Sequence, residues 1–188
     1  MANVEAFARA IECLAERGAA QVAHPGGTLL EHLQRTAAKL QSWGAAPELV
    51  TAGACHAAYG TAGFPTALVA LTERAWLRER IGEHAESIVY AYCADDRTSP
   101  LNVLRSDRFT GELQQSAYWL QRALAELTAA NELDVAAHIA ADTSKRAIGQ
   151  WLLSLGAWLS PAAWDAVQRA PCSQGVEIAA ASGDADIA

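Results

Sequence analysis

The chain has 188 residues, a length that suits one domain with a substantial core. Hydrophobic residues make up 52% and charged residues 19% of the sequence, which excludes a disordered chain and a solvated coiled coil. The formal net charge is −7 and the basic residues are scattered, so we expect no nucleic-acid-binding or anionic-membrane surface. A small molecule is the expected partner, and a phosphate-bearing one remains possible because a single local arginine can outweigh net charge.

The sequence favours a soluble, cytoplasmic protein. No uncharged apolar run approaches the roughly 18 residues of a membrane span, and charged side chains interrupt the N-terminal segment where a signal peptide would have its apolar core. The cysteines lie far apart and form no C-x-x-C pair, which argues against a zinc knuckle and a disulfide scaffold. We expect reduced thiols at Cys13, Cys55, Cys93 and Cys172.

Helical periodicity dominates the chain, and no segment alternates convincingly as a strand. Apolar residues spaced three to four apart predict helices over residues 2–18, 26–43, 46–59, 66–80, 82–94, 111–130, 133–141, 143–158 and 160–170. We therefore predict an all-α, single-domain helical bundle over residues 1–170. Residues 171–188 are small, acidic and aperiodic, and we expect a mobile tail there.

Three of the five histidines fall within residues 24–56. His32 lies at the edge of the apolar stripe of a predicted helix, and His56 lies in a segment that is apolar on every side. Both side chains are therefore expected to face the interior. His24 is too distant along the chain to join His32 on one helix, but the turn at residues 25–27 could fold it back toward the same place.

A carboxylate follows at the end of a later predicted helix. Asp96 stands at helical spacing after Tyr92 and Cys93, which predicts an inward orientation. Two histidines and one carboxylate from three helices suit a divalent transition metal such as Fe, Mn or Zn, so His32, His56 and Asp96 are the candidate ligands. The alternative is structural: hydrogen-bonded core histidines and a solvated helix end at Asp95 and Asp96.

Three further residues are candidates for catalysis. Tyr59 could donate a hydrogen bond to a substrate oxygen or act as a general acid, although packing against the following glycine is an alternative. Arg97 could clamp a phosphate or carboxylate, or instead form an internal ion pair. His24 could add a fourth ligand. Arg35 and Lys39 are interpreted as a solvated helix face.

The segments HPGGTLLEHL, HAAYGT and CADDR, in this order, resemble the HD-domain superfamily, especially the hydrolase domain of the (p)ppGpp synthetase/hydrolases. More closely, the first two are similar to a family of small HD-like proteins of unknown function with the motifs H-x-G-G-T-L-L-x-H-L and H-x-x-Y-G-T. The resemblance covers about residues 20–135. It implies an HD-like helical metal enzyme, most often a phosphohydrolase and in some cases a di-iron oxygenase, with His32, His56 and Asp96 as ligands.

One departure from the family pattern limits what the resemblance implies. The family has an aspartate after the second histidine, where this chain has Ala57, so a mononuclear site is expected rather than a dinuclear one. Three interpretations remain open. They are a metal-dependent hydrolase-type enzyme for a small metabolite, a mononuclear non-haem iron oxygenase or tailoring enzyme, and a metal-free HD-like catalyst or binding protein. Trp151 and Trp158, seven residues apart, could form a homodimer surface.

Overall fold

The computed structural model describes residues 2–96 and 105–175, and this part of the chain is mostly helical. Its eight α-helices are α1 (Ala2–Glu16), α2 (Leu29–Ser42), α3 (Pro47–Cys55), α4 (Arg74–Ile81), α5 (Glu83–Ala94), α6 (Tyr118–His138), α7 (Asp142–Ser154) and α8 (Pro161–Arg169). Two small antiparallel sheets pair β1 (Ala23–His24) with β2 (Gly27–Thr28) and β3 (Arg105–Ser106) with β4 (Leu113–Gln114). These short strands were not expected, because two-residue strands carry no alternating pattern.

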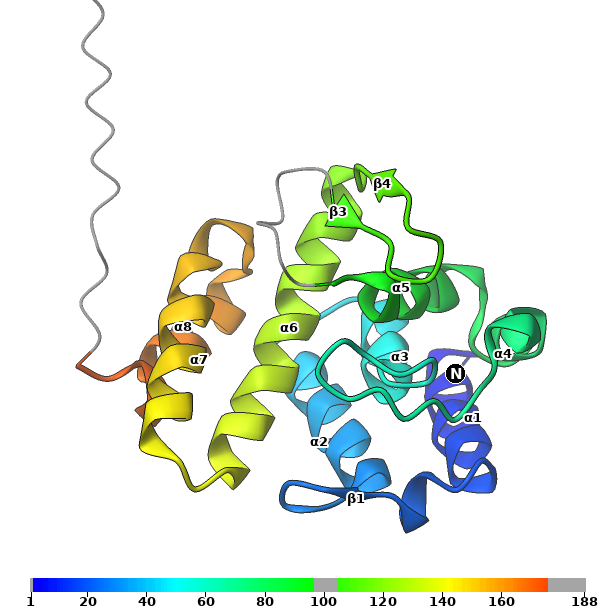
Figure 1. Cartoon of the computed structure of the whole chain (residues 1–188), viewed down its shortest axis with the longest axis horizontal. Helices are drawn as coiled ribbons and strands as arrows, with labels where there is room; N and C mark the ends of the chain where they lie inside the picture. The colour runs from blue at the N-terminus through cyan, green and yellow to red at the C-terminus, as the bar shows by residue number, and fades with distance from the viewer. Residues whose placement is uncertain (1, 97–104, 176–188) are drawn as a thin grey trace, which may run out of the picture.

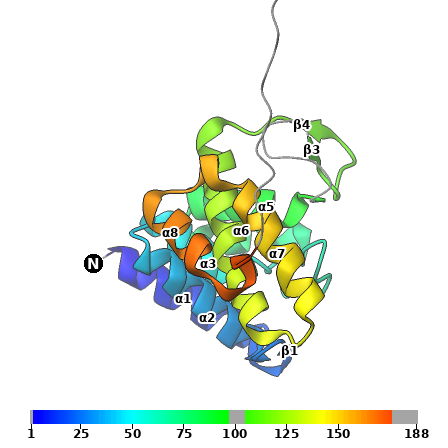
Figure 2. The same ribbon diagram turned by 90° about the vertical axis from the view of Figure 1, so that its left-hand side faces the viewer.

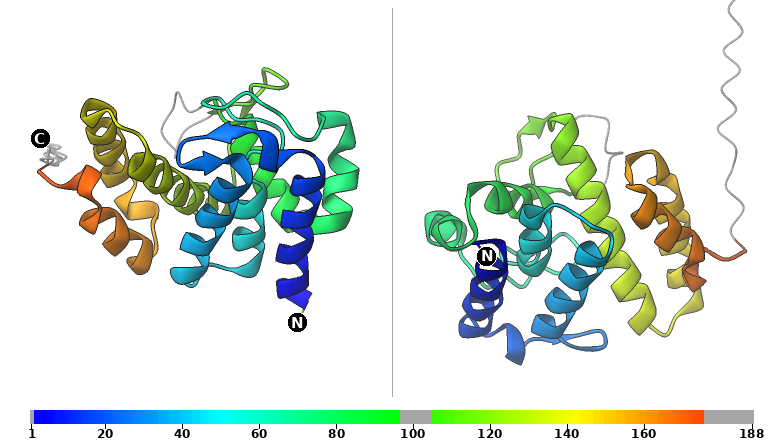
Figure 3. Two further views of the ribbon diagram at one scale, coloured as in Figure 1. Left: turned by 90° about the horizontal axis from the view of Figure 1, so that it is seen from below. Right: turned by 180° about the vertical axis from the view of Figure 1, so that it is seen from behind.

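The long helix α6 lies at the centre of the molecule. Figure 1 shows α7 and α8 on one side of it and α2, α3 and α5 on the other, and the view from behind in Figure 3 agrees. Figure 2, turned by 90°, places α7 and α8 in front of α6. Since both sides are covered, polar residues of α6 such as Asn131, Glu132 and Asp134 are buried. Residues 111–130 and 133–141 were predicted as two helices, whereas α6 runs continuously from Tyr118 to His138.

Helices α2 and α3 pack closely against each other. Gly53 of α3 makes this approach possible, because a Cβ atom there would lie 2.5 Å from Leu40 Cδ1 and 3.4 Å from the Ala37 Cα. Every residue of α3 from Leu49 to Cys55 is buried, as its all-round apolar sequence predicts. The close packing fixes the distance between side chains that α2 and α3 direct toward the interior.

Helix α2 begins three residues later than predicted. Thr28 and Glu31 form a capping box, in which the Thr28 hydroxyl accepts from the Glu31 amide and the Glu31 carboxylate accepts from the Thr28 amide. Residues 23–28 form a β-hairpin that immediately precedes the helix in the chain. Its turn depends on Gly26, whose φ of 82° favours glycine and whose Cβ position would coincide with the His138 ring.

The chain between α3 and α4 is a loop with a short 3₁₀ helix at Leu71–Glu73, so the predicted helices over 46–59 and 66–80 are shorter than expected. Thr61 and Phe64 close this loop locally, since the backbone amide of each donates to the carbonyl of the other. Other 3₁₀ turns occupy Ala19–Gln21, Gly156–Trp158 and Pro171–Ser173.

The C-terminal boundary of the folded unit lies beyond the predicted residue 170. Cys172 and Ser173 are buried, and their backbone passes so close to α7 that a Cβ on Gly149 would lie 1.9 Å from the Cys172 carbonyl oxygen. The rest of the expected tail, residues 176–188, lies outside the described residues. Trp158, one of the two expected dimer-surface tryptophans, packs on Tyr118 of its own chain. Among the described helices, none is both long enough and apolar enough to cross a membrane.

Candidate functional site

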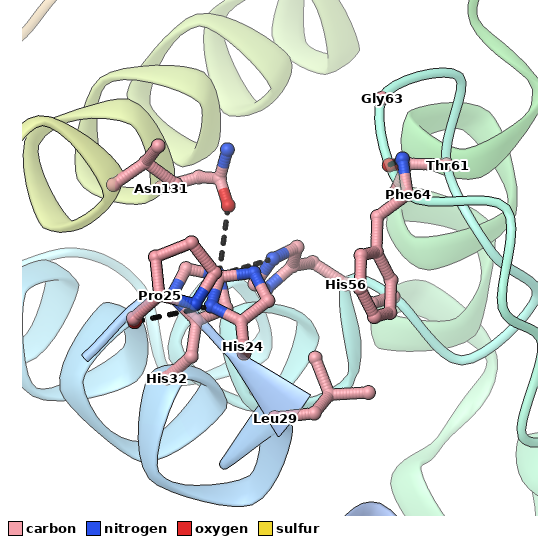
Figure 4. A pocket seen from close by; sticks show the side chains of 11 residues that line it. His24, Pro25, Leu29, His32, His56, Thr61, Gly63, Phe64 and Asn131 are labelled. Carbon is pink, nitrogen blue, oxygen red and sulfur yellow. Dashed lines mark hydrogen bonds between the residues drawn. The ribbon is translucent and has the colours of Figure 1, made fainter. Parts of the chain in front are cut away.

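A cavity of about 190 Å³ opens between α2, α3, α6, the β1–β2 hairpin and the loop after α3 (Figure 4). Its principal polar side chains are those of His24, His32, His56, Thr61 and Asn131. Its apolar wall includes Pro25, Leu29, Ala57, Phe64 and Val135. The structure therefore brings the three N-terminal histidines to one place, from the hairpin, α2 and the end of α3.

His32 is held by a buried carboxylate of α6. Its Nδ1 lies 2.8 Å from Asp134 Oδ2, and both side chains are only 1% exposed. Because a carboxylate only accepts, Nδ1 carries the hydrogen of this bond. The other ring nitrogen, Nε2, then points toward His56 and Asn131.

His56 is oriented by the backbone of its own helix. Its Nδ1 lies 2.8 Å from the Gly53 carbonyl oxygen, which also can only accept, so Nδ1 is protonated here too. The His56 carbonyl accepts a bond from the Cys93 thiol of α5. The His56 Nε2 is consequently the ring atom that faces the cavity, 3.2 Å from His32 Nε2.

Asn131 completes the cluster from α6. Its amide nitrogen donates to Glu132 Oε1 at 2.8 Å, which fixes the orientation of the amide group. Its Oδ1 lies 2.9 Å from His32 Nε2, a contact drawn as a dashed line in Figure 4. If both imidazoles are neutral, three acceptor atoms converge: two Nε2 lone pairs and one amide oxygen. Such a convergence calls for a proton or a cation among them.

This donor set fits a transition-metal ion. Two imidazole nitrogens bound to one tetrahedral ion at 2.0–2.1 Å lie roughly 3.3 Å apart, close to the 3.2 Å between His32 and His56. The carboxylate contact on His32 Nδ1 is the outer partner that metal-bound histidines usually have. Within residues 2–96 and 105–175, however, no group of three or more His, Cys, Asp or Glu side chains is arranged as a metal site. The third donor beside the histidines is an amide, in place of the expected carboxylate.

His24 lies over the same cluster without pointing end-on at it. Its ring stacks on His32 with centroids 4.0 Å apart, and its edge contacts Phe64. Burial, with the neighbouring His32 as a further cause, lowers the pKa of His24 to about 4, so the ring is neutral at pH 7. Its Nδ1 lies 3.4 Å from the Pro25 carbonyl. The stacked geometry differs from that of the fourth ligand that the sequence suggested.

Arg35 is part of the site's support, contrary to the interpretation as a solvated residue. It contacts both Asp134 oxygens at 2.9 Å and the hairpin carbonyls of Pro25 and Gly26 at 3.4 and 3.3 Å. Burial alone raises the pKa of Asp134, but hydrogen bonds from His32 and Arg35 outweigh burial and hold that pKa well below its ordinary value. Lys39 also lies near this carboxylate, at 3.7 Å.

Tyr59 does not line the cavity. It is 3% exposed, and its hydroxyl donates to the buried carboxylate of Glu86 at 2.9 Å. Arg74 forms a two-point ion pair with the same carboxylate. Burial and the bond to Glu86 raise the pKa of Tyr59. This arrangement is a buried polar network between the loop after α3, α4 and α5, and it places the expected general acid away from the histidines.

The site residues predicted at the end of α5 are Asp96, which does not line the cavity, and Arg97, which is not described. Asp96 follows α5, is partly buried and is not among the residues that line the cavity. Asp95, expected at the surface, is only 12% exposed and pairs with Arg105. Arg97 lies outside the described residues. The carboxylate that contacts His32 is Asp134, and the role of Asp96 as a ligand stays a prediction.

Asn131 and Asp134 were missed by sequence reasoning, although a signal was present. The two polar residues stand three positions apart in an alanine-rich helix, so they share one face. A polar pair at helical spacing inside an apolar helix indicates a buried site, because isolated polar groups are costly there.

Comparison with protein families finds a match over the N-terminal half of the chain. A family model described as a domain of unknown function, DUF6817, matches residues 13–97. No curated protein and no solved structure matches the chain. The matched segment contains His24, His32 and His56 but stops before Asn131 and Asp134, so the chain is similar to this family over the histidine-bearing part of its cavity.

Proposed function

We propose that the protein is a metal-dependent enzyme of the hydrolase type that acts on a small metabolite, with one divalent metal ion held by His32, His56 and the amide oxygen of Asn131. The supporting observation is that His32 Nε2 lies 3.2 Å from His56 Nε2 and 2.9 Å from Asn131 Oδ1. The hydrogens of His32 and His56 lie on Nδ1, and the Asn131 amide nitrogen donates to Glu132, so the remaining polar atom of each side chain is an acceptor. Neighbouring acceptor atoms repel one another, whereas a cation bound between them would interact favourably with each of the three.

The chemistry of the set supports a transition metal over magnesium or calcium. Imidazole nitrogens suit Zn, Fe, Mn and Co, and three protein donors leave positions for water and substrate. When bound, such a metal polarises a substrate oxygen and lowers the pKa of a coordinated water. We also infer an HD-like arrangement, since α2 and the end of α3 supply the two histidines and a later helix supplies the third donor.

The chain's own residues would orient the substrate. Phe64 and Val135 present apolar surface to it, and the neutral His24 offers an acceptor at the cavity rim. Asp134, fixed by Arg35, keeps the hydrogen of His32 on Nδ1 and thereby keeps Nε2 directed at the metal position. A cytoplasmic location is part of the proposal, because all four cysteines are free thiols.

Metal content tests the proposal. We expect untagged protein, purified without chelators or reconstituted with Zn(II), Mn(II), Fe(II) or Co(II), to hold about one equivalent by mass spectrometry. His56→Ala and Asn131→Leu should each lower the affinity by at least about tenfold. His84→Ala is the matched control, since this exposed histidine lies outside the cavity. Less than about a tenth of an equivalent in wild-type protein after reconstitution with every metal contradicts the proposal.

The same contacts favour a second candidate, a metal-free catalyst or ligand-binding protein. A proton on His32 Nε2 would also satisfy the cluster, because the resulting imidazolium would donate to Asp134 on one side and to His56 and Asn131 on the other. Nitrogen-15 chemical shifts of His32 distinguish the two candidates. Two protonated ring nitrogens at pH 7 in the presence of metal salts favour the metal-free candidate.

A further inference from the structure

The size and the lining of the cavity indicate what kind of ligand it binds. This inference rests on the proposed function only for the reaction that the ligand undergoes, and not for the binding itself. We propose that the ligand is a compact uncharged molecule, about the size of one six-membered ring with an amide, carbonyl or hydroxyl group, and that phosphorylated metabolites are disfavoured.

The volume of the cavity limits the size of the ligand. The cavity holds about 190 Å³, slightly more than an engineered apolar cavity of about 150 Å³ that admits benzene. Sites for drug-sized ligands measure roughly 300–1,000 Å³. A nucleotide would therefore leave most of its atoms outside the cavity, whereas a single substituted ring fits within it.

The lining of the cavity offers no charged side chain of its own to a ligand. Among the described residues that line the cavity there is no lysine, arginine, aspartate or glutamate. The nearby guanidinium of Arg35 is turned onto Asp134 and the hairpin carbonyls. In the metal-free cavity, a phosphate dianion would lose water without gaining the charged hydrogen bonds that phosphate sites normally provide.

Polar atoms lie at two separate places in the cavity. One end of the cavity is the cluster of His32, His56 and Asn131, and Thr61 lies on the loop that closes the other side (Figure 4). The Thr61 side-chain oxygen, Oγ1, accepts from the Phe64 amide at 3.1 Å. The hydroxyl hydrogen of Thr61 is therefore available to a ligand oxygen. Leu29 and Val135 add apolar surface to the lining. This pattern suits an uncharged ring with a polar substituent.

Ligand-observed NMR with the full chain tests the proposal, with benzamide, phenyl phosphate and adenosine monophosphate as probes. We expect benzamide to bind saturably and at least about tenfold more tightly than either phosphate. Binding is measured with EDTA-treated and with Zn(II)-loaded protein. The EDTA-treated protein tests the ligand preference without any metal. Failure of the proposed metal site and failure of the proposed ligand preference therefore give different results.

Val135→Phe fills the cavity from α6 and should weaken benzamide binding by at least about tenfold. Ala137→Phe adds the same ring to an exposed position of the same helix and should leave binding unchanged. If Val135→Phe does not fold, Ala57→Leu fills the cavity from the other side. Phenyl phosphate binding more tightly than benzamide to the EDTA-treated protein overturns the proposal, and so does the absence of benzamide binding at about 10 mM.

Discussion

His32 and Asp134 are joined by a buried hydrogen bond of 2.8 Å although 102 positions separate them in the chain. The bond links α2 to α6 beside the cavity, and each side chain is 1% exposed. Asp134 also accepts from Arg35, so one carboxylate orients the histidine and anchors the residue that holds the hairpin. The position of His32 Nε2 thus depends on a residue that does not itself line the cavity.

Asp134→Asn should lower the free energy of unfolding by about 2–3 kcal/mol, because it leaves Arg35 and His32 without their charged acceptor. Metal affinity should fall by about 10- to 100-fold. Denaturant unfolding of metal-free protein and metal titration measure the two effects. Asp142→Asn is the control, since that carboxylate is 82% exposed, and its change should stay within about 0.5 kcal/mol. Equal effects of both substitutions contradict the role of Asp134.

Arg35→Lys should loosen the β1–β2 hairpin although it keeps the charge. A lysine ammonium can contact Asp134 but lacks the planar set of donors that also reaches the carbonyls of Pro25 and Gly26. We expect faster hydrogen exchange at Leu29, whose amide donates to Val22 across the base of the hairpin. Arg9→Lys on the exposed face of α1 serves as the control. Unchanged exchange in Arg35→Lys would show that the hairpin does not depend on the guanidinium.

Asn131→Asp should make stability depend on metal. A carboxylate at this position would face Glu132, which now accepts from the Asn131 amide, so the metal-free variant should unfold at a lower temperature than wild type. A bound cation should reverse the loss, since the new carboxylate is a stronger donor than an amide. Thermal unfolding with and without Zn(II) measures both effects. A metal-induced increase no larger than that of wild type argues against Asn131 as a donor.

Tyr59→Phe should cost about 1 kcal/mol of stability and leave benzamide and metal binding unchanged. The substitution removes one hydrogen bond to Glu86, but Arg74 still satisfies that carboxylate. Unfolding experiments and the NMR assay test the two parts. A loss of ligand binding with little loss of stability would restore Tyr59 to the catalytic role that the sequence suggested.

His24 should make metal-free protein less stable in mild acid. Its pKa is about 4 in the folded chain, whereas an unperturbed histidine titrates near 6.5. Between these values the unfolded chain binds more protons, so stability from this residue falls as pH decreases from about 6.5 to about 4 and levels off below. NMR titration of the His24 ring checks the midpoint, and His24→Gln should reduce the pH dependence. A midpoint near 6.5 would contradict the burial of the ring.

Local sequence determined which faces of the helices point inward. The apolar stripe of α2 and the all-round apolar α3 predicted buried His32 and His56, and both are 1–2% exposed. The ends of the helices were less predictable. The capping box at Thr28 and Glu31 starts α2 after the glycine turn, and residues 56–59 and 66–70, which were predicted as helical, lie in the loop that follows α3.

Tertiary structure alone decided which groups meet in the cavity. Periodicity shows that a side chain faces the interior, but it does not show which distant helix lies opposite. Asp96 follows one predicted helix and Asp134 lies on another, and only the packing of α6 against α2 brings Asp134 to His32. The same packing turns Arg35 from an expected surface residue into a support of the site. Tyr59 is directed away from the histidines because Glu86, buried on α5, provides its acceptor.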